Sequence, residues 1–487
     1  MRKFIVLLGV LVFSIFFSIE GFANFADTHG MSASGIARGN AMTAIASDWS
    51  ATYYNIAGLG KTKRNSVESK DTGDSASEGD KKYDLTGLHD QLAISYFYTN
   101  PDFEIDIPRE TRMDEDLEAG IVCIGIAFDL NNIYKMPDFI SSSRFGLALG
   151  LMADKNIAKI NDIDIKTHTF LRYGRELSAP AIIAGLGLGF MDDLFAIGFG
   201  ANVLVGGEGA IKMDSVTIGN EDVPLAYQVK IDVGPEIAPV LGLYMNVGEL
   251  TSILEGLEFG LAYKGEVYVE IDPLDAVAQT QLLDIELELT LGVCDYYTPD
   301  IYSFGIAYTP PFISKLTVSA DYEFQKYSDY KLSSTRHRYW EEERTTPENY
   351  VNYELPDFQD IFVPKLGVSY EFNQWLTLLG GYYYQPAFVE DDANNGIFNF
   401  LDNDKRVFSI GSEFIIPKMA GMVVPIQFNI GFQYQQLIDR DVHKLRLDNS
   451  IALSESSGPS NYWNLFNPDY SYGGSNYLVT CEVIIRM

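Results

Sequence analysis

The sequence contains few residues whose types and spacing could carry out catalysis or bind a metal ion. The histidines are scattered, and no two of them have the spacing of metal ligands. No Ser, His and Asp group indicates a nucleophilic enzyme, and the three cysteines are too few and too scattered for a disulfide framework or a metal cluster. We therefore predict no catalytic residue, no metal site and no cofactor, and we do not expect an enzyme. The histidines are His29, His89, His168, His337 and His443.

Two short motifs are similar to ligand-binding loops but lack the context that such loops need. Residues 185–189 read Gly-Leu-Gly-Leu-Gly, like a nucleotide-binding loop, yet no βαβ pattern surrounds them. Residues 391–396 are similar to a calcium loop, but Gly396 takes a ligand position if the loop starts at Asp392. Loose binding of divalent ions by the outer loops is an alternative.

The first 23 residues have the pattern of a secretory signal peptide. Arg2 and Lys3 provide the positive start, and residues 4–17 are nearly all apolar. Residues 21–23, Gly-Phe-Ala, place small residues at the two positions that a signal peptidase reads. The alternative is a membrane anchor, but the apolar run is short for a hydrocarbon core of ~30 Å. We expect cleavage before Asn24.

The composition restricts the class of protein. The formal net charge of −32 would repel nucleic acid, so we exclude that partner. After the signal peptide, no stretch reaches the ~18 apolar residues of a membrane-spanning helix. Nevertheless the chain is 47% hydrophobic and 13% aromatic. A transmembrane β-barrel has this composition because its apolar residues occupy alternating positions.

From about residue 91 the sequence alternates with period 2. In residues 426–435, Ile, Phe, Ile, Phe and Tyr alternate with Gln, Asn, Gly, Gln and Gln. Residues 316–325 and 365–372 alternate in the same way. Successive side chains of a strand point to opposite faces, so each of these segments predicts a strand with one apolar and one polar face.

The strands and the gaps between them predict the architecture. We expect fourteen strands, separated in turn by long gaps of 19 residues or more and short gaps of 13 or fewer. Long outer loops and short periplasmic turns are typical of a transmembrane antiparallel β-barrel. The predicted strands are 91–98, 119–130, 144–156, 180–190, 194–206, 236–247, 257–270, 300–309, 316–328, 362–372, 375–385, 405–416, 424–438 and 475–487.

Two of the long gaps, 207–235 and 271–299, also contain alternating segments. We interpret them as hairpin extensions that project outward from the barrel. A barrel of sixteen strands is the alternative.

The region before the barrel differs from it in composition. Residues 24–60 are rich in small residues, have no period of 2, and are long enough to fold back into the lumen as a plug. Residues 61–82 are polar and of low complexity. We therefore predict an all-β fold with a signal peptide at 1–23, a hatch at 24–60, a polar linker at 61–90 and the barrel at 91–487.

The hatch resembles that of the FadL family of outer-membrane transporters, which carry long-chain fatty acids and aromatic hydrocarbons. The resemblance rests on Ser-Gly-Ile-Ala-Arg-Gly-Asn-Ala at 34–41, Ala-Ser-Asp at 46–48 and Tyr-Tyr-Asn-Ile-Ala-Gly-Leu at 53–59. The family's usual Asn-Pro-Ala is Asn55-Ile56-Ala57 here, so a proline that would fix the backbone of the turn is missing.

The resemblance implies a barrel in the outer membrane of a Gram-negative bacterium that moves a hydrophobic small molecule past a movable hatch. It implies a monomer in contact with outer-membrane lipid and lipopolysaccharide. We take the long outer gaps 207–235 and 271–299 as candidates for a groove that captures the molecule. The resemblance assigns the gating positions to Gly35, Arg38, Gly39, Asp48, Asn55, Ile56 and Ala57.

A fatty acid would need a cation to bind its carboxylate. The candidates are Arg38 in the hatch, Lys365 on an inward-facing strand position, and Arg172 in a long gap. Arg38 could instead pair with the barrel wall, and Lys365 with a lumen carboxylate such as Glu371. A neutral hydrocarbon is as plausible a cargo as a fatty acid.

Other functions remain open at this stage. The main alternative is a FadL-like barrel that serves as a secretion shuttle or a structural component of the outer membrane. A barrel enzyme such as a lipase and an ordinary porin are further alternatives.

Overall fold

The structure is a computed structural model of the 487-residue chain. It describes residues 25–61, 90–106, 118–152, 169–170, 181–191, 193–204, 208–218, 221–232, 235–280, 285–330, 336–339, 358–390, 400–416, 424–443 and 469–487. The predicted signal peptide, the linker between 62 and 89, Arg172 and the segment 391–396 lie outside these residues.

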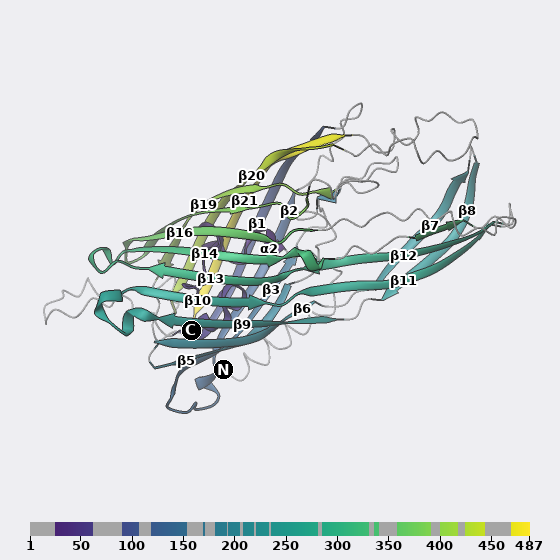
Figure 1. Ribbon diagram of the computed structural model, residues 1–487. Helices are drawn as coiled ribbons and strands as arrows, with labels where there is room; N and C mark the ends of the chain where they lie inside the picture. The colour runs from purple at the N-terminus through teal and green to yellow at the C-terminus, as the bar shows by residue number, and fades with distance from the viewer. Residues whose placement is uncertain are drawn as a thin grey trace, which may run out of the picture.

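Fourteen strands form a closed antiparallel barrel, in which each strand pairs with the next along the chain and β1 pairs with β21 (Figure 1). The prediction of a fourteen-stranded barrel is confirmed, and the alternative of sixteen strands is wrong. The strands are β1 Gln91–Asp106, β2 Ala119–Asp129, β3 Ile140–Met152, β5 Ala181–Phe190, β6 Phe195–Leu204, β9 Glu236–Asn246, β10 Leu257–Lys264, β13 Asp300–Tyr308, β14 Leu316–Lys326, β16 Ile361–Asn373, β17 Leu376–Gln385, β19 Lys405–Ile416, β20 Ile426–Val442 and β21 Tyr470–Arg486.

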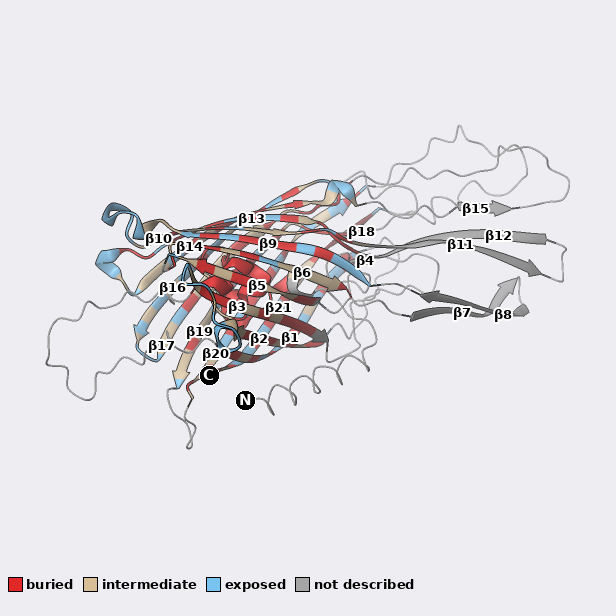
Figure 2. Ribbon diagram, turned by 90° about the horizontal axis from the view of Figure 1, so that it is seen from below, coloured by how far each residue is buried: buried red, intermediate tan, exposed pale blue. Residues whose placement is uncertain are grey.

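The barrel is polar inside and apolar outside, as the alternation predicts. On β20, Gln427, Asn429 and Gln433 are buried in the lumen, whereas Ile430 and Phe432 are about two-fifths exposed on the outer face. Figure 2 shows the same alternation of buried and exposed residues along the other strands. Because a closed sheet pairs its backbone groups internally, such an outer face suits a medium without water.

The two ends of the barrel differ. At one end the strands are joined by short connections, several of which contain 3-10 turns: η2 Leu130–Asn132, η4 Val247–Glu249, η5 Ser252–Leu254 and η6 Pro311–Ile313. A further 3-10 turn, η7 Tyr327–Asp329, follows β14 at the other end. Also at that end, hairpins extend beyond the barrel: β7 Glu208–Ile218 with β8 Glu221–Asp232, and β11 Val267–Thr280 with β12 Ile285–Thr298 (Figure 1). Three shorter strands complete the fold: β15 Arg336–Tyr339 pairs with β12, and β18 Phe400–Leu401 pairs with β4 Thr169–Phe170.

Some predicted strand boundaries were wrong. The strand predicted at 257–270 is two elements, because β10 ends at Lys264 and β11 leaves the barrel from Val267. The Gly265 amide donates to the carbonyl oxygen of Pro239 on β9, 2.8 Å away, one position beyond the last pair of β9 and β10. β1 is longer than predicted and continues to Asp106 by pairing with β21.

The described part of the N-terminal segment consists of short helices that lie inside the barrel: α2 Phe25–His29, α3 Ala33–Ala37, α4 Ala51–Tyr54 and η1 Ile56–Gly60 (Figure 2). Residues 31–36 and 49–60 are buried. Among the described residues, no helix has the length and apolar character needed to span a membrane. The segment fills the lumen, and we call residues 25–61 the hatch.

Candidate functional site

One side of the lumen presents backbone to the hatch. β5, β6 and β9 have glycine at their inward positions, and hatch residues 55–60 pack directly on them. A Cβ on Gly198 would lie 2.4 Å from the Ala57 nitrogen, and one on Gly187 would lie 2.6 Å from the Gly60 nitrogen. No side chain fits there, so the Gly-Leu-Gly-Leu-Gly motif is a steric requirement of the hatch. We call the following residues the glycine cradle: Gly185, Gly187, Gly189, Gly198, Gly200 and Gly242.

The missing proline of the hatch turn is explained by this cradle. The Ile56 side chain is fully buried, with its Cδ1 in the recess left by Gly185 and Gly200. Asn55 holds the turn, because its Oδ1 accepts from the Ala57 amide at 3.2 Å. Its Nδ2 donates to the carbonyl oxygens of Thr43, at 2.7 Å, and Leu243 on β9, at 3.0 Å. The turn is therefore fixed by side-chain contacts.

Arg144 at the start of β3 holds the end of the hatch. Its Nε donates to the Leu59 carbonyl oxygen at 2.6 Å. Its Nη2 donates to the carbonyl oxygens of Ser47, Gly58 and Lys61 at 3.0, 3.1 and 2.6 Å. A buried guanidinium thus donates to three carbonyl groups at the end of η1 and to a fourth, that of Ser47, elsewhere in the hatch.

Lys61 provides a second attachment at the same end. Its ammonium pairs with Glu258 of β10 at 2.9 Å and lies 4.0 Å from the ring centroid of Tyr244. The Tyr244 hydroxyl donates to the same Glu258 carboxylate at 2.9 Å. All three side chains are buried, so the charge of the lysine is balanced inside the lumen.

The opposite side of the lumen contacts the hatch through polar side chains. Arg38 pairs with Glu413 of β19 at 3.0 Å, and the Ser34 hydroxyl donates to the same carboxylate at 2.7 Å. The Trp49 indole Nε1 donates to Glu482 of β21 at 3.1 Å. We call this side, formed by β19, β20, β21 and β1, the polar wall.

His29 contacts β20 through a hydrogen bond of its ring. Its Nδ1 lies 3.0 Å from Nε2 of Gln435, which fits a neutral ring accepting a hydrogen bond. Burial, aided by the positive charge of Lys405, lowers the pKa of His29 to about 3. The ring is therefore neutral when the hatch is seated.

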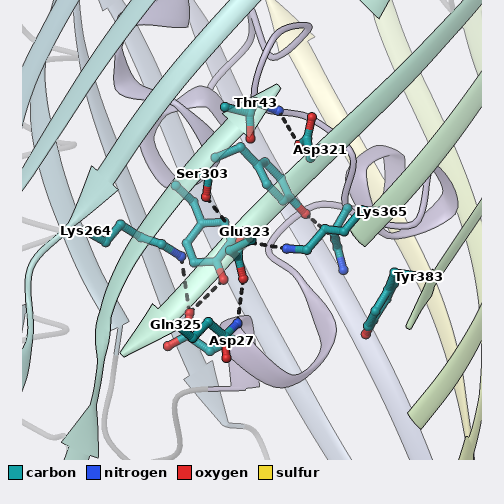
Figure 3. Close-up of polar contacts among 12 residues, drawn as sticks. Asp27, Thr43, Lys264, Ser303, Asp321, Glu323, Gln325, Lys365 and Tyr383 are labelled. Carbon is teal, nitrogen blue, oxygen red and sulfur yellow. Dashed lines mark hydrogen bonds and ion pairs between the residues drawn. The ribbon is translucent and has the colours of Figure 1, made fainter. Parts of the chain in front are cut away.

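A polar cavity of about 30 Å³ lies between the hatch and the strands β10, β13, β14 and β16 (Figure 3). Lys264 pairs with Asp27 of the hatch at 3.3 Å and lies 3.9 Å from the ring centroid of Tyr53. Across the cavity, Lys365 pairs with Glu323 at 2.7 Å. A space of this size holds water molecules but no fatty acid or hydrocarbon chain.

The structure positions the remaining predicted residues as follows. The carboxylate that pairs with Lys365 is Glu323 rather than Glu371, because β14 and β16 align Asp321 with Lys365 and bring Glu323 within reach. Asp48 accepts from the amide and hydroxyl of Ser50 within the hatch, at 3.0 and 2.6 Å.

Two hatch glycines are required by close packing. A Cβ on Gly35 would meet the Tyr54 hydroxyl at 2.3 Å. Gly39 has φ +60° and lies against the Tyr382 backbone nitrogen, 2.7 Å from where its Cβ would be. Both glycines therefore let the hatch approach its neighbours closely.

Sequence reasoning missed Arg144, Lys61, Glu258 and Glu413. A signal for Arg144 exists: Arg144, Gly146 and Ala148 are alternate, inward-facing positions, so a cation stands at the end of a row of small residues. Its partners are carbonyl oxygens more than 80 positions away in the chain, and no local pattern identifies them.

A closed fourteen-stranded β-barrel whose lumen holds an N-terminal hatch is the fold of FadL-type barrels. No family model matches the sequence. The chain is similar to the crystal structure of a FadL homologue from Pseudomonas aeruginosa, with a TM-score of 0.51 and 12% identity, covering 96% of this chain and 100% of that one.

The sequence is also 24% identical over 436 residues to alkane uptake protein A of Marinobacter nauticus, covering 86% of this chain and 85% of the relative. The predicted resemblance to the FadL family is confirmed.

Proposed function

We propose that this protein carries a neutral hydrocarbon across the outer membrane, past a hatch that closes the barrel until it is displaced. The proposal includes removal of the signal peptide at 1–23 and a monomeric barrel in contact with lipid and lipopolysaccharide. No chemical change of the cargo is part of it.

The observation that carries this proposal is the way five cations of the described lumen are engaged. Arg38 pairs with Glu413, Lys61 with Glu258 and Lys264 with Asp27, and Lys365 pairs with Glu323. Arg144 is held by hatch carbonyl oxygens. A carboxylate cargo would have to displace a protein carboxylate from one of these cations, whereas a neutral cargo would not.

The similarity to a protein named for alkane uptake supports the same class of cargo. In this proposal Arg38 holds the closed hatch and Lys365 stabilises the wall. Gly35, Gly39, Asp48, Asn55, Ile56 and Ala57 shape the hatch that must move. Arg172 and the outer groove predicted at 207–235 and 271–299 stay predictions, because the structure does not describe those side chains.

The test compares binding of n-hexadecane and palmitate by the purified full-length protein in mild detergent. We expect retention of hexadecane and weak binding of palmitate. Palmitate can reach Lys365 only when the hatch is displaced and the cavity widens. The Glu323→Gln variant removes the carboxylate that neutralises Lys365 and should then raise palmitate affinity about fivefold, the equivalent of ~1 kcal/mol for a partly buried ion pair. Hexadecane binding should not change.

Glu371→Gln is the matched control, because it removes the same charge from β16, the strand of Lys365, at a side chain that does not pair with that lysine. Wild-type protein that prefers palmitate would overturn the neutral cargo. A protein that binds neither probe but co-purifies with a secreted polypeptide would favour the secretion shuttle.

A further inference from the structure

The short connections at one end of the barrel expose large apolar side chains at their tips. Ile253 is 89% exposed, Phe312 is 80% exposed and Met191 is 75% exposed. Ile133, Phe139 and Trp375 are each more than half exposed. The six residues come from five different connections, those between β2 and β3, β5 and β6, β9 and β10, β13 and β14, and β16 and β17. We call them the apolar rim.

The apolar rim is continuous with the outer face of the barrel. Phe139 stacks on Phe190 at a centroid distance of 6.4 Å, and Phe190 stacks on Phe195 at 5.3 Å. Trp375 stacks on Phe414 at 6.4 Å. Phe195 and Phe414 are outward-facing residues of β6 and β19. The surface that faces lipid on the strands therefore extends onto the connections.

The distribution of these residues indicates what covers them. The five connections are spread around the circumference of the barrel rather than gathered on one side. A protein partner docks on a compact patch, whereas a bilayer surrounds the barrel and contacts every connection. Burying each exposed side chain in lipid is favourable by ~25 cal/mol per Å² of apolar surface.

The charges beside the apolar rim fit an interfacial position. Lys135 and Asp138 are exposed on the connection between β2 and β3, Glu249 and Glu255 on that between β9 and β10, and Lys315 on that between β13 and β14. Both signs occur, so the connections do not select an anionic surface. A neutral phospholipid would accept the apolar tips while the charged neighbours stay among headgroups and water.

We propose that the apolar rim inserts into the phospholipid leaflet of the outer membrane on the side of the short connections, and thereby sets the depth of the barrel in the bilayer. The partner is the acyl-chain region of the lipid. This inference does not depend on what the barrel transports.

The test uses the full-length protein, carrying Cys123→Ala, Cys294→Ser and Cys481→Ser, reconstituted in dioleoylphosphatidylcholine vesicles. Single cysteines at Ile253→Cys and, as a matched control two residues away, Glu255→Cys carry an environment-sensitive fluorophore. We expect a blue-shifted emission at position 253, with loss of fluorescence when the acyl chains carry a nitroxide. The label at position 255 should show neither effect.

A second pair, Phe312→Cys and Lys315→Cys, repeats the comparison on another connection. If the fluorophore perturbs the turn at position 253, the second pair still tests the inference on an independent connection. Labels at both apolar positions that report water and escape the lipid quencher would overturn the inference. So would labels that are shielded only when a periplasmic extract is added, because a protein would then be the partner.

Discussion

The two sides of the lumen hold the hatch by different means. The glycine cradle on β5, β6 and β9 touches the hatch through backbone atoms at distances that exclude even a Cβ. The polar wall touches it through long side chains, such as those of Arg38 and Glu413. One contact depends on shape and the other on hydrogen bonds and charge.

The comparison shows which contacts of the hatch can be replaced by contacts with water. Water can replace a polar partner, so the bonds of Glu413 and Glu482 to the hatch can break without leaving unsatisfied groups once the space is wet. Close backbone packing has no such substitute, because a gap of about 1 Å already loses up to roughly half of the dispersion attraction. We therefore expect the cradle side to respond to changes in volume and the polar wall to changes in charge.

The largest effect should come from filling the glycine cradle. Gly198→Val places a branched side chain where a Cβ alone would lie 2.4 Å from the Ala57 nitrogen. Since both neighbours are backbone, we expect the seated hatch to lose about 4 kcal/mol or more. The barrel should stay closed as a sheet, with a conducting lumen. Conductance in planar bilayers and flux of a polar solute into vesicles measure this opening.

Gly380→Val is the matched control for that variant. A Cβ on Gly380 of β17 meets its nearest atom at 3.9 Å, which is ordinary contact. This variant should conduct no more than the wild type. Equal conductance of the two valine variants would contradict a steric role for the cradle.

A smaller effect is expected from Arg144→Met. The methionine fills much of the space but leaves the carbonyl groups of Ser47, Gly58, Leu59 and Lys61 without this donor. We expect a loss of about 3 kcal/mol in hatch seating, from charge-assisted hydrogen bonds to a buried cation. Faster amide exchange at residues 58–61, measured by mass spectrometry, would report it.

Arg144→Lys separates charge from geometry, because it keeps the charge but loses the planar fork. It should restore only part of the protection. Full protection in Arg144→Met would show that the guanidinium does not hold the hatch.

The smallest effect should come from lowering the pH, which acts on His29 where the hatch contacts the polar wall. Burial lowers the pKa of His29 to about 3 when the hatch is seated, against 6.5 when the ring is exposed. The displaced state therefore binds a proton as pH falls below 6.5, and the seated state does not until about pH 3. The contribution of His29 to the stability of the seated hatch is complete above pH 6.5 and decreases below it, by about 2 kcal/mol at pH 5.

The contribution of His29 is the difference between wild type and His29→Gln in conductance measured from pH 8 to pH 4, and the wild type should open progressively more than the variant as the pH falls. Gln keeps a side-chain acceptor toward Gln435 but does not titrate in this range. An unchanged pH profile in His29→Gln would assign the acid response to other groups.

The sequence alone determined the barrel. Alternation over residues such as 426–435 specifies which side chains face lipid, because the period of a strand is 2 and a shift of one residue would turn every apolar side chain inward. The alternation of long and short gaps determined the number of strands and the end at which the hairpins project. The small residues and motifs at 34–41 and 53–59 indicated the hatch. Alternation, gap lengths and motifs are all properties of short stretches of sequence.

Only the tertiary structure decided how the hatch is held. Arg144 and Leu59 are 85 positions apart, and Arg38 and Glu413 are 375 apart. Such contacts are set by barrel register and closure, which bring inward positions of distant strands against one helix or turn. Local pattern could indicate that Lys365 faces the lumen, but only the alignment of β14 with β16 selected Glu323 as its partner. The physical reason is that the side chains of one strand that point into the lumen follow from the period of that strand alone. Which of them form an ion pair depends on the register between strands and on the closure of the barrel.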